Sequence, residues 1–137
     1  MATNSVYGNV EAYMSRSDLD PLLAGLRKVL GVGAQVATEE YAERRHSVSF
    51  SLLTSEDVDQ SAVMDAIRPI TGGGMSRGII YFVDIRDMQK NDAPDITLFD
   101  LSISSDPVVE GTWFGVSAQP EDFLDPDYSI VHYSEMP

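Results

Sequence analysis

The amino-acid sequence predicts an α+β fold: a ferredoxin-like (split βαβ) antiparallel sheet with two helices on one face and a C-terminal β extension. Three observations lead to this prediction. Residues 5–14 alternate in apolar character with period two, which is typical of a half-buried strand. Residues 19–30 and 56–70 repeat apolar side chains at three- and four-residue steps, as amphipathic helices do. Short β-rich segments complete the order strand, helix, strand, strand, helix, strand up to residue 85.

The first helix has the strongest pattern. Its apolar stripe consists of Leu19, Leu22, Leu23, Leu26, Val29 and Leu30. We expect Ser17 or Asp20 to accept hydrogen bonds from the first amides, and Pro21 to fit the first turn. Gly31 or Gly33 is expected to end the helix, because glycine tolerates the left-handed backbone found at helix ends.

Two strands are expected next, over residues 34–42 and 46–54, and in the second one apolar residues alternate strictly with serines. The candidate turn between them is the polar stretch Glu39-Glu40 or Glu43-Arg44-Arg45. Neither stretch contains an Asn-Gly or Asp-Gly turn signal, so one long bent strand remains an alternative. The second helix is expected to begin at Glu56 after a cap by Thr54 or Ser55, and to end near Pro69.

The rest of the chain is predicted to form short strands and loops. Residues 78–85 are apolar on both faces, which predicts a central strand. The later expectations are a strand over 96–103, a turn at Asp106-Pro107, a hairpin of 108–109 with 113–116, an acidic loop over 121–127 and an edge strand over 128–133.

Length and composition predict one domain over residues 1–137, with a βαββαβ core in 1–90 and an acidic, β-rich extension of the same domain in 91–137. The chain has no cysteine, which removes disulfides and thiolate metal sites and fits a reducing compartment. It has no long apolar segment, and its first residues do not resemble a signal peptide. A cytoplasmic protein without a membrane segment is therefore expected.

Charge is the dominant feature of the composition. There are 22 acidic and 9 basic residues, a net charge of −13. Residues 91–137 contain ten of the carboxylates and no lysine or arginine, and they also contain six aromatic residues. Because a merely solvating tail would have few aromatics, this third of the chain is interpreted as a folded acidic face.

Catalytic and metal chemistry find little support in the sequence. His46 and His132 have no triad or metal-ligand spacing around them. The glycine-rich run 71–78 lacks the P-loop lysine and precedes a strand, so it is interpreted as a connector. Two groups of carboxylates, neither with the spacing of a calcium loop, are Asp92, Asp95 and Asp100, and Asp122, Asp125 and Asp127. No catalytic residue, metal or cofactor is predicted.

These observations favour a non-enzymatic acidic inhibitor that binds a basic, nucleic-acid-acting protein by charge mimicry, such as an immunity protein against a bacterial toxin or a phage anti-defence inhibitor. The partner would be a toxin or nuclease effector; direct nucleic-acid or membrane binding is not expected, and homo-oligomerisation is left open. The alternatives are a small-molecule sensor of ferredoxin-like fold and a small enzyme without a recognisable motif. The predicted partner-binding residues are Asp106, Glu110, Trp113, Phe114, Glu121, Asp122, Asp125 and Asp127.

Overall fold

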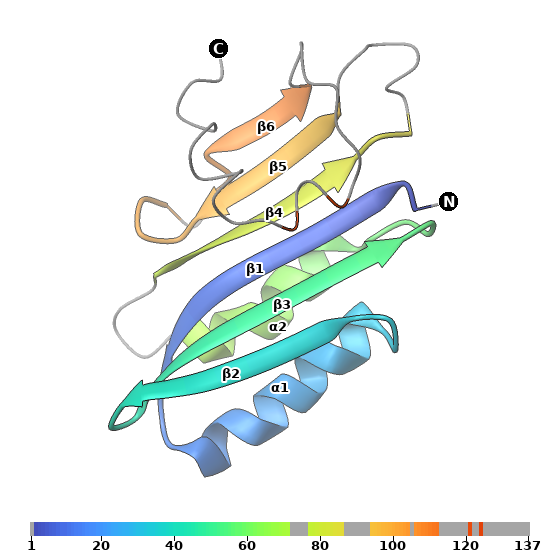
Figure 1. Cartoon of the computed structure of the whole chain (residues 1–137). Coiled ribbons are helices and arrows are strands. Elements are labelled where there is room, and N and C mark those ends of the chain that lie inside the picture. Colours follow the sequence, from blue (N-terminus) through green and yellow to red (C-terminus); the bar gives the residue numbers. More distant parts are fainter. Residues whose placement is uncertain are drawn as a thin grey trace.

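The computed structural model describes residues 2–71, 77–86, 94–104, 106–112, 121 and 124. Its strands are β1 (Asn4–Tyr13), β2 (Gln35–Ala42), β3 (Arg45–Thr54), β4 (Gly78–Asp84), β5 (Asp95–Asp100) and β6 (Val109–Thr112), and its helices are α1 (Arg16–Leu30) and α2 (Gln60–Thr71). These strands form one antiparallel sheet in the order β2-β3-β1-β4-β5-β6. Both helices lie on the same side of it (Figure 1). The prediction of an α+β fold with an antiparallel sheet and two helices is confirmed.

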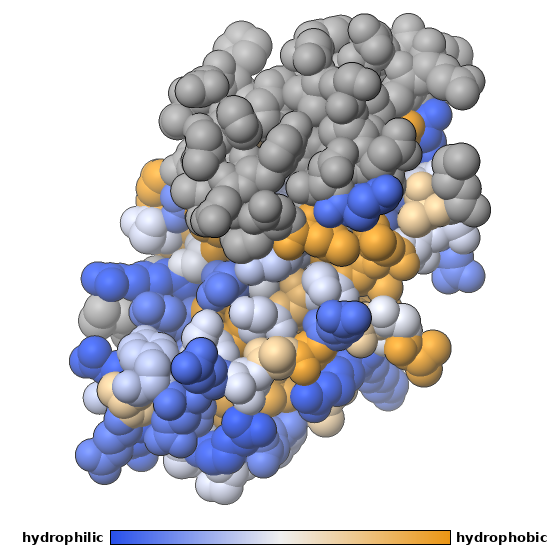
Figure 2. Space-filling view, in the orientation of Figure 1, coloured by the Kyte–Doolittle hydropathy of each residue, from blue (hydrophilic) through white to orange (hydrophobic). Residues whose placement is uncertain are grey.

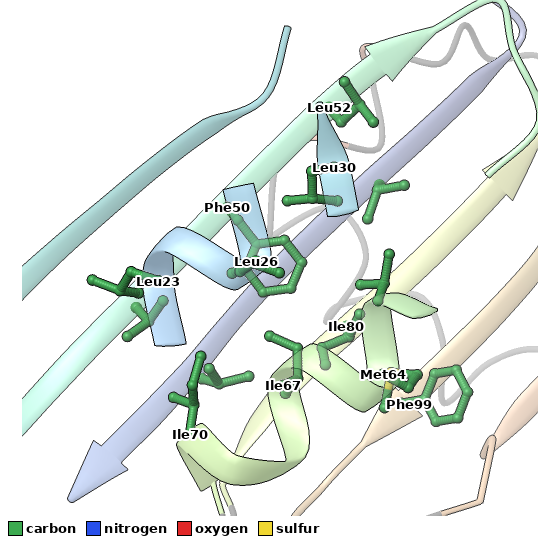
Figure 3. Packing of buried hydrophobic residues seen from close by; sticks show 14 of the residues in the cluster. Leu23, Leu26, Leu30, Phe50, Leu52, Met64, Ile67, Ile70, Ile80 and Phe99 are labelled. Atoms are coloured by element: carbon green, nitrogen blue, oxygen red, sulfur yellow. The ribbon is translucent and has the colours of Figure 1, made fainter. Parts of the chain in front are cut away.

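The main core lies between the sheet and the helices (Figure 3). Even-numbered residues of β1 and β3 face the helices, because successive side chains of a strand point to opposite faces. The leucine stripe of α1 is buried against them, and Leu23 and Leu26, on which the helix prediction depended, are 1% and 0% exposed. Gly8 of β1 stands between Phe50 of β3 and Ile80 of β4 in this layer, so the Phe50 ring lies over a position without a side chain.

A second apolar cluster lies on the other face of the sheet, over β4 and β5. Its buried members are Tyr7, Tyr81, Val83, Ile96 and Leu98, and Leu124 of the acidic third packs against them. The strand β4 is therefore buried on both faces, as its apolar sequence predicted. On the same face hydrophilic residues gather over β2 and β3 (Figure 2).

Helix α1 has its N-cap two residues before Ser17, the earlier of the two predicted cap residues. Ser15 is the N-cap, and its side chain accepts a hydrogen bond from the Asp18 amide at 3.3 Å. The prediction of Ser17 or Asp20 is wrong: both are inside the helix, and so is Pro21, beyond the first turn. Several residues near this helix start are of types that cap well, so residue type alone does not select one.

The alternative of one long bent strand is excluded, since β2 and β3 form a hairpin with Glu43 and Arg44 as its turn. Arg44 has φ of 60°, a left-handed conformation that is rare outside glycine and asparagine. The turn thus forms with one residue in the left-handed region and without the Asn-Gly or Asp-Gly pair that usually signals a tight hairpin.

Helix α2 begins at Gln60 rather than at Glu56. Asp59 caps it, and its Oδ1 accepts a hydrogen bond from the Ala62 amide at 3.1 Å. The carboxylates of Glu56 and Asp57, predicted in the first turn, instead belong to the loop before the helix. In this loop, the Asp57 carboxylate accepts a hydrogen bond from Arg86.

The described part of the acidic third adds β5 and β6 to the sheet beside β4. The strand predicted over 96–103 ends at Asp100, because the Asp100 carboxylate turns the chain by accepting hydrogen bonds from the amide and hydroxyl of Ser102. The predicted hairpin after Asp106-Pro107 is wrong, since residues 109–112 form a single strand that pairs with β5. The strand predicted over 128–133 lies outside the described residues.

Of the helices that the structure describes, α1 has 15 residues and α2 has 12. Neither is long and apolar enough to cross a bilayer, which takes about 20 apolar residues.

Candidate functional site: an acidic cavity at the amino end of α2

A cavity of about 340 Å³ opens where β1 and β5 begin, β4 ends and the loop enters α2. It is lined by Asn4, Ser5, Asp57, Val58, Gln60, Phe82, Val83, Asp84, Arg86, Asp95 and Thr97. Three of these residues are aspartates and one is an arginine, so the lining has a formal charge of −2. The cavity is small for a ligand site, since such pockets usually measure about 300–1,000 Å³.

Asn4, Asp84 and Asp95 form one row across three strands. Asp84 is directly opposite Asn4 in the β1–β4 pair and directly opposite Asp95 in the β4–β5 pair. Side chains at opposite positions of adjacent strands point to the same face, with Cβ atoms about 5 Å apart. Two carboxylates in this arrangement repel each other and destabilise the sheet. A local conflict of this kind is more typical of a binding site than of a structural one.

Arg86 offsets part of this repulsion. Its Nε donates to both carboxylate oxygens of Asp84 at 3.0 Å, and its Nη2 donates to Oδ2 at 2.5 Å. Its backbone amide also donates to Asp84 Oδ1 at 2.9 Å, and Nη1 donates to Asp57. One guanidinium therefore joins the end of β4 to the loop before α2, although the arginine side chain remains half exposed.

The electrostatics of Asp84 follow from these contacts. Burial alone would raise the pKa of Asp84, but the hydrogen bonds and the charge of Arg86 outweigh it and lower this pKa below its ordinary value. The two aspartates raise the pKa of Arg86 further above its usual value. Asp84 and Arg86 are therefore both charged over the physiological pH range.

The neutral polar residues of the cavity are Asn4, Ser5, Gln60 and Thr97, whose side chains can donate as well as accept hydrogen bonds. Asn4 is 7% exposed, and its Nδ2 donates to the Glu56 carbonyl at 2.9 Å and to the Thr3 hydroxyl at 3.4 Å. No residue in the described part of the chain donates a hydrogen bond to Asn4 Oδ1. Together with the carboxylates, this acceptor suits a ligand that has N–H donors and a positive charge. Among the described residues, no group of three or more carboxylates or histidines could hold a metal ion.

The chain matches no protein-family model, no curated protein and no solved structure.

Of the predicted partner-binding residues that the structure describes, none lines this cavity. Glu110 is the nearest of them, since it is exposed and directly opposite Thr97, which lines the cavity. Asp106 is exposed in the connection beyond the far end of β5, and Glu121 is exposed. Trp113, Phe114, Asp122, Asp125 and Asp127 lie outside the described residues.

The other candidate groups are the two histidines, the carboxylates near β5 and the glycine-rich run, and the structure describes only part of them. His46 is 0% exposed, and its Nε2 is bonded to the Met14 carbonyl at 3.0 Å rather than to a serine or a carboxylate. Asp95 and Asp100 stand at opposite ends of β5, so they do not share a ligand. His132, Asp92 and residues 72–76 of the glycine-rich run lie outside the described residues.

Most of this site is absent from the residues that the sequence predicts to be functional. The sequence pattern puts Asp57 in the first turn of a helix and residues 78–85 in an apolar strand. Asp95 alone is a candidate, in a group with Asp92 and Asp100. The sequence contained one signal for this site. Asp84 ends a strand that is apolar on both faces, and Arg86 follows two residues later, which favours a local ion pair. The cross-strand partner Asp95 depends on the register of β4 with β5, which the sequence did not reveal.

We expect Arg86→Gln to raise the pKa of Asp84 because the burial of the carboxyl remains while its cation is lost. In the wild type the lowered pKa means that ionised Asp84 stabilises the fold above about pH 4, and that this contribution is lost as the pH falls through the folded-state pKa. In the variant this pH dependence should shrink or reverse. Carboxyl NMR titration, with urea unfolding from pH 2 to 7, measures both effects. An unchanged Asp84 titration would contradict the assigned contacts.

Proposed function

We propose that this protein is a non-enzymatic binding protein whose acidic side docks on a basic, nucleic-acid-acting protein and takes the place of nucleic-acid phosphates. A toxin or a nuclease effector would be such a partner, and immunity or anti-defence inhibition would be the outcome. The observation that supports this proposal best is the pair of directly opposed carboxylates, Asp84 and Asp95, at a cavity whose wall is continued by the exposed Glu110.

An acidic surface acts on a basic partner through its electrostatic potential. Clustered carboxylates with few counter-charges produce a negative potential, which attracts a basic partner and accelerates its association. Residues 91–137, to which Asp95 and Glu110 belong, contain ten carboxylates and no lysine or arginine. Inhibition by docking requires no catalytic group.

We also propose that β1 to β4 with α1 and α2 are a ferredoxin-like unit to which β5 and β6 are added. The order β2-β3-β1-β4, with all neighbours antiparallel, supports this finer description. A cytoplasmic location is part of the proposal as well, because a chain without cysteine suits a reducing compartment.

Two matched triple variants test the docking face. Asp106→Asn/Glu110→Gln/Glu121→Gln removes three exposed carboxylates of the acidic third, and Glu39→Gln/Glu40→Gln/Glu43→Gln removes three exposed ones from the β2–β3 hairpin. With a basic partner captured from a lysate and then purified, stopped-flow kinetics across a salt series should show association about tenfold slower for the first variant at low salt. The hairpin variant, which has the same change in net charge, should differ much less from the wild type.

Exposed carboxylates act mainly on association, so dissociation and thermal unfolding should change little in both variants. An association rate that ignores salt and both triple variants would contradict the docking proposal.

The cavity favours a second candidate, a small-molecule-binding sensor, because it is concave and has several convergent polar groups. Native mass spectrometry of the purified protein tests this candidate: a bound small molecule that survives dialysis and is lost in Asp84→Asn would favour the sensor.

A further inference from the structure

We propose that the protein forms a symmetric dimer through the outer edge of β2, with β2 of two copies paired antiparallel in one continuous sheet. This inference goes beyond the proposed function and does not depend on it, because β2 and the strands of the acidic third lie at opposite edges of the sheet. Among the described residues no strand pairs with the outer side of β2 (Figure 1). This strand contains no proline or lysine, two residues that commonly protect an edge from pairing.

A hydrogen bond at the end of the β1–β3 ladder shows how the backbone groups of β3 are directed. The Met14 amide donates to the Arg44 carbonyl at 2.9 Å, just outside the opposed residues Tyr13 and Arg45. Tyr13 and Arg45 are therefore a non-hydrogen-bonded pair, because in an antiparallel ladder such pairs are flanked by the bonds of their neighbours. Since bonded and non-bonded pairs alternate, the odd-numbered residues of β3 turn their amides and carbonyls toward β2 instead of β1.

The outward backbone groups of β2 follow from this pattern. The odd-numbered residues of β3 are opposite odd-numbered residues of β2, so those residues are bonded to β3. The amides and carbonyls that point to the outer edge belong to the residues between them, Val36, Thr38 and Glu40. No described residue bonds to these groups. An edge with unpaired amides and carbonyls is a template for pairing with another chain.

Symmetry and charge together select one register for two copies of β2. A two-fold axis at Thr38, perpendicular to the sheet, pairs Thr38 with its own copy and Val36 with Glu40 of the second copy. All three outward residues of both copies are then paired. An axis at Ala37 would leave Glu40 opposite a residue that precedes β2. An axis at Glu39 or Glu40 would place a carboxylate directly opposite its own copy, which is destabilising.

The helix side of this register is complementary in charge. Arg16 of α1 donates from Nε to Asp20 and from Nη1 to the Thr38 hydroxyl at 2.7 Å, so its guanidinium lies beside the proposed axis. Glu40 faces the helices as well, because it is opposite the buried His46. Within the described residues, neither Nη2 of Arg16 nor the exposed Glu40 carboxylate has a partner.

The dimer would bring these two groups together. Glu40 of the second copy is the diagonal neighbour of Thr38, a separation that long side chains span. Two symmetry-related pairs of Arg16 with Glu40 would therefore form. They act against the long-range repulsion between two chains that each have a net charge of −13. This local complementarity favours a second copy of the chain over an unrelated strand as the occupant of the edge.

Single-cysteine variants test the register directly, because the chain has no cysteine of its own. In the proposed dimer the two Thr38 Cα atoms are about 5.5 Å apart, a separation that suits a disulfide. Under mild oxidation Thr38→Cys should become a covalent dimer at least about tenfold faster than Ala37→Cys, whose own copy lies two residues further along the strand. Cross-linking that is equal in both variants, or faster in Ala37→Cys, would overturn the inference.

A charge exchange tests the same contact without a covalent bond. Sedimentation velocity over a concentration series at fixed salt should show a monomer–dimer equilibrium for the wild type. Arg16→Glu should weaken dimerisation about tenfold, because each dimer then has two like-charge contacts. The double variant Arg16→Glu/Glu40→Arg should recover most of the lost affinity. The matched control Arg68→Glu changes the net charge as much as Arg16→Glu does, on the exposed surface of α2, and should weaken dimerisation much less.

Thermal unfolding of each variant confirms that it is folded. A wild type that stays monomeric at the highest concentration would overturn the inference. So would a double variant that dimerises no better than Arg16→Glu, or a loss in Arg68→Glu as large as that in Arg16→Glu.

Discussion

Gly8→Ala is expected to destabilise the protein by about 3 kcal/mol, because an added methyl group has no space in this layer of the core. An ideal Cβ at Gly8 would lie 2.0 Å from Cζ of Phe50, and real contacts of this kind do not occur. The Phe50 ring is 1% exposed and packs under the helices, so it cannot swing into solvent (Figure 3). Urea unfolding followed by circular dichroism measures the change in the free energy of unfolding.

Two further variants make this result decisive. Gly25→Ala in α1 meets no atom within 4 Å, so it should be neutral or stabilise the protein by about 0.5–1 kcal/mol through helix propensity. In a Phe50→Leu background, Gly8→Ala should cost clearly less than in the wild type, because the two positions are in direct contact. Equal costs in both backgrounds would show that the ring over Gly8 is not the cause.

His46→Ala is expected to destabilise the protein by about 3 kcal/mol, through a cavity and through the lost hydrogen bond. His46 is 0% exposed in the main layer of the sheet, where its Nε2 bonds to the Met14 carbonyl at 3.0 Å and its Nδ1 has no partner. His46→Leu fills most of the space and removes the unpaired Nδ1, so it should cost about half as much.

A control at Ser49, on the other face of β3, tests whether burial is the cause of the stability lost in His46→Ala. Ser49→Ala, at a half-buried position on β3, should change the free energy of unfolding by no more than about 0.5 kcal/mol. A His46→Ala variant as stable as Ser49→Ala would mean that His46 is not buried in solution. Chemical unfolding at a fixed pH of 7.5 measures all three variants under the same conditions.

The helices and the long strands could be predicted because their apolar periodicity is local. The leucine stripe of α1 and the alternation of β3 each lie within one segment of the chain, and burial of that pattern decides the element. Helix starts were less predictable: Ser15 caps α1 and Asp59 caps α2, although neighbouring residues could have capped equally well. The β2–β3 turn lies in one of the two polar stretches that the sequence offered, Glu43-Arg44-Arg45. The sequence did not single it out, because Arg44 adopts a conformation that arginine seldom favours.

The candidate site could not be predicted in the same way, because its parts are far apart in the sequence. Asp57, Asp84 and Asp95 meet only because β4 pairs with β5 in one register and the loop before α2 returns to the same end of the sheet. A shift of one residue in that register would place Asp95 on the opposite face. Nothing in the local sequence opposes such a shift, since β4 is apolar on both faces.

By itself, the sequence determined the class of the fold, the strand that is buried on both faces and the charge of the surface, since each depends on composition or on short-range periodicity. Only the tertiary structure decided that β1 stands between β3 and β4, that Phe50 covers Gly8, and that Asp84 faces Asp95 beside Arg86. The physical reason is that the apolar periodicity of a segment decides which of its faces is buried. Strand order and register decide which residues of other segments that face contacts.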